Sequence, residues 1–110
     1  MISGVTIQIG GASETFRLTT RAMMALEETT GKGIVDFLQE VEAGFRIGTF
    51  ALLLAEIADD GAGRDIPWAQ SAIDQIGFAR AVALVGEVSE AAFPEAKGAA
   101  KNLKRAVRSA

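Results

Sequence analysis

Residues 5–18 have the sequence VTIQIGGASETFRL, in which apolar and polar side chains alternate on either side of a glycine pair. Alternation at every second residue is typical of a half-buried β-strand, and a glycine pair readily adopts the positive φ angles of a tight turn. The pattern predicts a hairpin with strands near 5–9 and 14–18. Because an isolated hairpin is only marginally stable in water, its apolar face should pack on helices. That face consists of Val5, Ile7, Ile9, Phe16 and Leu18.

Apolar side chains then recur at the spacing of amphipathic helices. Thr19 or Thr20 is the expected N-cap of a first helix that ends at Gly31. A second short helix is predicted over about 34–41. A third, capped by Thr49, is predicted over about 50–58. The third helix is the most apolar stretch of the chain, so we expect it at the centre of the core.

Two more helices are predicted in the second half of the chain. Pro67 suits the first turn of a fourth helix that begins near Asp65. A fifth should begin at Phe78 and continue until Pro94 ends the pattern. The apolar faces of all five helices predict the core, and among their members are Met24, Phe78 and Val82.

These patterns predict an α+β, mostly α fold, in which an N-terminal β-hairpin packs on a bundle of four to five short helices. The 110 residues suffice for a single domain with one modest core, expected over residues 1–94. Residues 1–94 hold six basic and thirteen acidic residues, a net charge of −7, whereas residues 95–110 carry +4. This asymmetry marks residues 95–110 as a basic C-terminal tail.

The chain contains no His, Cys or Tyr. It therefore lacks the commonest general base, the commonest metal ligand and the best nucleophile. The GKG segment at 31–33 lacks the spacing of a phosphate-binding loop. The loop from Asp60 to Asp65 lacks oxygen ligands at the positions that a calcium loop requires. We expect no catalytic residues, no cofactor and no metal, which leaves binding to other proteins as the predicted role.

Candidate partner contacts come from one aromatic residue and from the tail, namely Trp68, Lys101, Lys104, Arg105 and Arg108. Trp68 is either a half-buried staple on the core or an exposed anchor, since tryptophan is enriched at interface hot spots. The tail admits three interpretations. It is a solvated chain end, a basic helix along an acidic partner or the protein's own acidic body, or a nucleic-acid contact. The last is weakly supported because no aromatic residues are interleaved with the basic ones.

Residues 18–31, LTTRAMMALEETTG, contain the pattern L-T-x-x-A-x-x-x-L-E-x-x-x-G. The pattern follows a short hairpin and precedes short helices that end at glycines, a loop over 61–67 and a last helix that ends in EAAF at 90–93. In this pattern and order of elements, residues 4–93 resemble small proteins encoded between the tail tube and the tape measure in gene transfer agents and related siphophages. Members of that family are labelled tail-assembly chaperones or tail tube proteins.

The resemblance implies a non-catalytic helper in tail morphogenesis. Such a helper would coat the tape-measure protein and recruit tail-tube protein in the cytoplasm of a bacterial host. A tape measure exposes long apolar helical stripes until the tube encloses it, and a groove between helices can cover such a stripe. The alternative is a structural tail or neck component that stays in the virion tail. A second copy of the chain, in a homo-oligomer, is a further candidate partner.

Neither nucleic acid nor a membrane is an expected partner. The acidic body would repel phosphate groups. The longest apolar run, residues 50–55, has six residues, far below the roughly 20 that a membrane span needs. The N-terminus also lacks the basic stretch and apolar run of a secretory signal.

Overall fold

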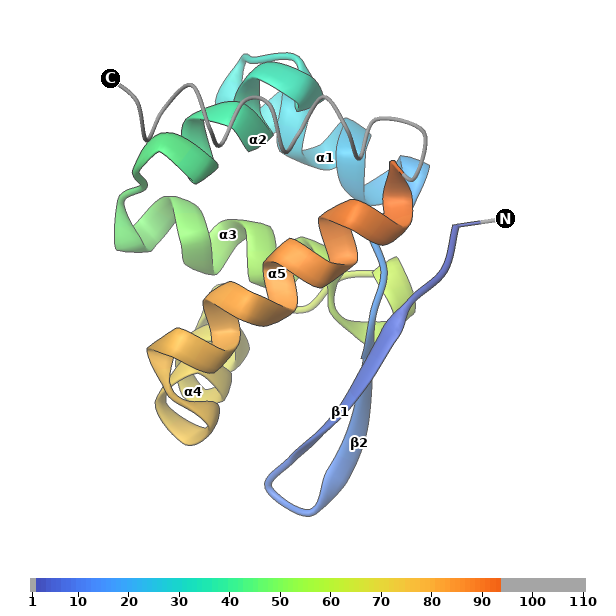
Figure 1. Ribbon diagram of the computed structural model, residues 1–110, viewed down its shortest axis with the longest axis vertical. Helices are drawn as coiled ribbons and strands as arrows, with labels where there is room; N and C mark the ends of the chain where they lie inside the picture. The colour runs from blue at the N-terminus through green and yellow to red at the C-terminus, as the bar shows by residue number, and fades with distance from the viewer. Residues whose placement is uncertain (1, 94–110) are drawn as a thin grey trace.

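Residues 2–93 form a two-stranded antiparallel sheet and five α-helices in the computed structural model, which describes this part of the chain (Figure 1). The predicted class, α+β and mostly α with an N-terminal hairpin, is confirmed. The predicted basic tail, residues 95–110, lies outside the described residues. In chain order the elements are β1 Val5–Ile9, β2 Ala12–Phe16, α1 Thr20–Thr30, α2 Ile34–Ala43, α3 Ile47–Ile57, a short 3-10 turn η1 Asp59–Gly61, α4 Ile66–Ile76 and α5 Phe78–Ala92.

The hairpin forms in the alternating segment, but its second strand begins two residues earlier than predicted. Ile9 pairs with Ala12, so only Gly10 and Gly11 form the turn. Their φ angles are 58° and 82°. A two-residue turn with both φ angles positive matches the natural twist of the strands. Because β2 starts directly after this turn, the predicted strand over 14–18 is wrong in its position.

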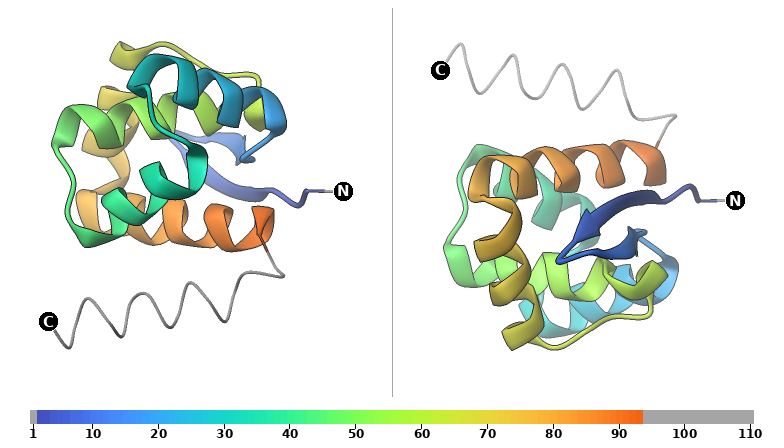
Figure 2. Two further views of the ribbon diagram at one scale, coloured as in Figure 1. Left: turned by 90° about the horizontal axis from the view of Figure 1, so that it is seen from above. Right: turned by 90° about the horizontal axis from the view of Figure 1, so that it is seen from below.

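One face of the hairpin packs on the helices, as predicted. Val5, Ile7 and Ile9 are partly buried against the core, while Phe16 and Leu18 are fully buried. β1 contacts α4 and α5, and β2 contacts η1. Figure 2 shows the resulting arrangement, with the hairpin between α5 on one side and the η1 turn on the other.

Side-chain caps define the starts of two helices. Thr19 Oγ1 accepts a hydrogen bond from the backbone N–H of Ala22 at 3.2 Å. Asp65 Oδ1 accepts one from the N–H of Trp68 at 2.9 Å. These bonds satisfy backbone donors that have no partner inside the helix. Both predicted starts are confirmed, and α1 ends at a left-handed Gly31 as expected.

The start of α3 differs from the prediction, and Thr49 does not cap it. The N–H of Phe50 donates to the carbonyl of Arg46 at 3.0 Å. This bond makes Arg46 the N-cap residue and places Thr49 inside the first turn; no side chain caps this end. Ile47, predicted to precede the helix, therefore becomes its first residue.

α3 occupies the centre of the core, as its sequence predicted. In Figure 1 the α1–α2 pair lies above α3 and α4 lies below it, and α3 contacts both α1 and α4. The buried side chains of α3 are those of Phe50, Ala51, Leu53, Leu54, Ala55 and Ile57.

Three predicted core side chains face outward instead. Met24 is 63% exposed, Phe78 46% and Val82 38%. Met24 lies two residues from both Ala22 and Leu26, about 200° around the helix from each. Since those two are buried, Met24 must lie on the opposite face. Ala81, Leu84, Val85 and Val88 form the buried face of α5, and Phe78 and Val82 lie at the exposed edge of that face.

Candidate functional site

The loop between α3 and α4 is fixed to the hairpin by Glu14, a carboxylate that is only 8% exposed. Glu14 Oε2 accepts hydrogen bonds from the N–H of Asp59 and from Arg64 Nε, both at 2.7 Å, and Oε1 accepts one from Arg64 Nη2 at 3.0 Å. The hydrogen bond to Glu14 is the main reason that the pKa of Arg64 is raised above its ordinary value. Glu14 therefore serves to hold the loop, a role that the sequence analysis missed.

Gly61 fits the same loop against the start of α1. Its φ angle is 84°, and its carbonyl accepts hydrogen bonds from Thr19 Oγ1 at 3.0 Å and Arg21 Nε at 2.8 Å. An ion pair between Arg17 and Asp60, with an N–O distance of 2.6 Å, lies beside it. The acidic loop is thus a fixed part of the fold.

Trp68 lies half-buried beside this loop. Its ring centroid is 6.1 Å from that of Phe16, and the Arg64 Cζ atom lies 4.9 Å from the Trp68 ring centroid. This is the geometry of the half-buried staple, one of the two interpretations of Trp68. Contact between Trp68 and a partner stays a prediction. The other predicted partner residues, Lys101, Lys104, Arg105 and Arg108, lie outside the described residues.

An apolar groove, here called the α3–α4 groove, opens where the start of α3 faces α4 and the α4–α5 junction. Its volume is about 520 Å³. Three of its lining side chains are large, apolar and exposed: Ile47 at 59%, Ile66 at 36% and Phe78 at 46%. Exposed apolar side chains gathered around a groove are typical of a protein-binding surface. The other lining residues are Gly48, Ala51, Gln70, Ile73, Asp74 and Gly77.

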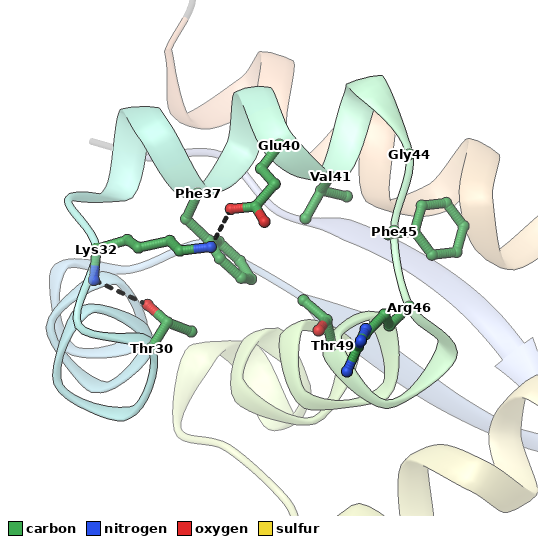
Figure 3. Close-up of a pocket in the computed structure, with 9 residues that line it drawn as sticks. All are labelled: Thr30, Lys32, Phe37, Glu40, Val41, Gly44, Phe45, Arg46 and Thr49. Carbon is green, nitrogen blue, oxygen red and sulfur yellow. Dashed lines mark hydrogen bonds and ion pairs between the residues drawn. The ribbon is translucent and has the colours of Figure 1, made fainter.

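A second hollow, here called the α2–α3 pocket, lies between α2 and α3 (Figure 3). Its volume is about 670 Å³, and its floor includes the buried side chains of Phe37 and Val41. Two cations lie on its rim. Lys32 Nζ forms an ion pair with the Glu40 carboxylate, while Figure 3 shows Arg46 beside Thr49 at the other end. The remaining lining residues are Thr30, Gly44, Phe45 and Thr49.

Three aromatic rings connect the two hollows. Phe45 lines the α2–α3 pocket and Phe78 lines the α3–α4 groove, and their ring centroids are 5.6 Å apart. Both rings contact Phe50, at centroid distances of 4.9 and 5.6 Å. Arg46 of the pocket also directly precedes Ile47 of the groove in the chain. The two hollows therefore lie on either side of this ring cluster, close to the α2–α3 loop.

Two acidic residues, Glu27 of α1 and Glu40 of α2, have separate structural contacts. Glu27 Oε2 accepts a hydrogen bond from the N–H of Ile34 at 2.9 Å, at the start of α2, while Glu40 pairs with Lys32. Within residues 2–93, no group of three or more His, Cys, Asp or Glu side chains could hold a metal ion. The helices of this same part are all too short or too polar to span a membrane.

No protein-family model, curated protein or solved structure matches this chain. What the two hollows bind must therefore be inferred from the chemistry of their own side chains.

Proposed function

We propose that this chain is a non-catalytic tail-assembly chaperone of the phage type, which binds the tape-measure protein and tail-tube subunits in a bacterial cytoplasm. The observation that carries the proposal is the α3–α4 groove, where Ile47, Ile66 and Phe78 remain exposed. The pattern in residues 18–31 supports the choice of client, because it resembles tail-assembly chaperones of gene transfer agents and siphophages.

The shape of the groove suits the apolar stripe of a helix. An amphipathic helix docks in a groove through apolar side chains three or four residues apart. The groove is lined in part by small residues, which lets a partner helix approach closely; these are Gly48, Ala51 and Gly77. A tape-measure protein that is not yet enclosed by its tube would present such stripes along its length.

The energetics favour a reversible complex. Covering the exposed part of a side chain such as Ile47 or Phe78 contributes about 1 kcal/mol, roughly half of the ~2 kcal/mol for complete burial. Three such side chains supply on the order of 3 kcal/mol, before the entropy cost of association is subtracted. A single groove therefore binds weakly. Many copies along one client would shield it and could still be displaced by tail-tube subunits.

The groove can be tested by co-expressing the chain with the tape-measure protein of the same gene cluster and measuring how much client it captures. The double variant Ile47→Asp/Phe78→Asp places two charges in the apolar groove and should abolish capture. Val35→Asp is the matched control, since Val35 is 55% exposed on α2 and does not line the groove.

Each variant must first show a cooperative thermal transition, so that loss of capture is not loss of folding. Capture by the double variant at the level of the wild type would contradict the proposal. Equal loss in the Val35→Asp control would also contradict it, because the effect would then not depend on the groove.

A further inference from the structure

The α2–α3 pocket differs from its neighbouring groove in chemistry. Its floor is apolar at Phe37, which is 2% exposed, and at Val41, which is 9% exposed. Its rim is polar and carries two cations, Lys32 and Arg46. A volume of about 670 Å³ is large enough to admit side chains of a partner.

The two cations of the rim differ in their availability. Lys32 is held by the carboxylate of Glu40, on the same rim. Arg46 has no ion pair among the described residues, and it is exposed. Figure 3 shows its side chain beside Thr49, whose side chain also lines the pocket. The end of the pocket at Arg46 therefore combines a guanidinium that forms no ion pair with a described residue and the hydroxyl of Thr49.

A partner that complements both features carries a carboxylate next to an apolar side chain. We propose that the α2–α3 pocket binds an acidic residue and a neighbouring apolar residue of a partner helix. The carboxylate lies at Arg46 and the apolar side chain lies over Phe37 and Val41. A guanidinium is suited to this role because its planar array of donors matches a carboxylate.

The position of the pocket extends the groove. Arg46 and Ile47 are consecutive residues, and the rings of Phe45 and Phe78 lie 5.6 Å apart across the boundary. A partner helix with its apolar stripe in the α3–α4 groove would reach Arg46 if it extends past the α2–α3 loop. The identity of the client rests on the proposed function, whereas the preference for an acidic residue rests on the pocket alone.

The preference can be measured without the natural client. The probes are two blocked, alanine-based helical peptides with the same leucine stripe, one carrying Glu beside the stripe and the other Gln. Each is titrated into the full-length ¹⁵N-labelled chain. The Glu peptide should bind about two- to fivefold more tightly at low salt, the range of a solvent-exposed ion pair. Its additional shifts should fall on the residues that line the α2–α3 pocket.

Two variants separate charge from shape. In Arg46→Gln the two peptides should bind equally, and in Arg46→Glu a Lys peptide should become the preferred one. The difference between the Glu and Gln peptides should also shrink when NaCl rises from about 0.05 to about 0.5 M, because salt screens exposed pairs.

Equal binding of the Glu and Gln peptides to the wild type would overturn the inference and leave the apolar groove untouched. Failure of both peptides to bind would overturn it as well. Loss of tape-measure capture in the groove variants tests the proposed function separately, because neither Ile47 nor Phe78 lines the α2–α3 pocket.

Discussion

Gly61→Ala should destabilise the fold far more than a glycine substitution at a surface turn. Two features of Gly61 combine. Its φ angle of 84° is one that L-residues with a side chain rarely adopt. An added Cβ would lie 2.3 Å from Thr19 Cγ2 and 2.9 Å from the Arg17 carbonyl oxygen. Both distances are shorter than any van der Waals contact, so the loop or the start of α1 must move.

The loss of stability in Gly61→Ala follows from its φ angle and its close contacts. A left-handed conformation costs a residue with a Cβ roughly 1–2 kcal/mol. Inserting a methyl group into a packed site costs about 1–3 kcal/mol. The sum is a loss of about 2–5 kcal/mol, against a total stability of about 5–15 kcal/mol for an ordinary domain. The variant should therefore remain folded in the cold and unfold at much lower urea.

Urea unfolding followed by the fluorescence of Trp68, the single tryptophan, measures this loss. Gly31→Ala is the matched control, because Gly31 has a similar φ angle of 72° and a Cβ there would meet nothing within 4 Å. Gly31→Ala should lose only the stability that the left-handed conformation costs, about 1–2 kcal/mol. In a Thr19→Ser background, which removes Cγ2 and keeps the capping hydroxyl, part of the Gly61→Ala loss should be recovered. If Gly61→Ala and Gly31→Ala lose the same stability, the close packing of Gly61 against α1 is wrong.

Two further outcomes concern the core and the tail. Leu54→Ala should lower the free energy of unfolding in urea by about 2–5 kcal/mol, since Leu54 is fully buried in the central helix. Met24→Ala, at an exposed position, should change it by less than about 0.5 kcal/mol. A similarly small loss for Leu54→Ala would place Leu54 outside the core. Deletion of residues 95–110 should leave a cooperative thermal transition, because the buried residues described lie between Glu14 and Val88. A broad, non-cooperative transition would show that the tail belongs to the core.

The hairpin and the helices could be predicted because their signals are local. Gly10 and Gly11 mark the turn, and alternation marks the strands on either side of it. The same signals do not define the exact pairing, since the length of the turn decides where β2 begins. Thr49 is a good capping residue by type, yet the hydrogen bond to the carbonyl of Arg46 starts α3 earlier. Competing starts of this kind differ by little free energy and cannot be ranked from local sequence.

The contacts of Glu14 could not be predicted because its partners are distant in the chain. Its spacing of two residues from Phe16 places it on the inward face of β2, which is a usable signal. A carboxylate is seldom buried unless it is paired, and its partner Arg64 lies fifty residues later. The pattern therefore indicates the face on which Glu14 lies, but not the partner that allows its carboxylate to be buried.

The α3–α4 groove was hidden by the same periodicity that revealed the helices. Phe78 recurs at helical spacing with buried residues, so the pattern predicts it in the core, and a cap at Thr49 places Ile47 before the third helix. Periodicity identifies an apolar side chain but not whether the fold supplies a neighbour to cover it. Phe78 is 46% exposed because no element among residues 2–93 covers that face of α5 completely.

We propose that the chain binds a tape-measure protein during assembly and leaves before the particle is finished. The most direct test compares, by quantitative mass spectrometry, the amount of this chain in tape-measure complexes from the cell lysate with its amount in purified particles. We expect many copies per tape measure in the lysate complex, greater solubility of the co-expressed tape measure, and a near absence of this chain from particles. A stoichiometric amount in purified tails, together with a tape measure that is equally soluble alone, would contradict the chaperone role and indicate a structural tail component.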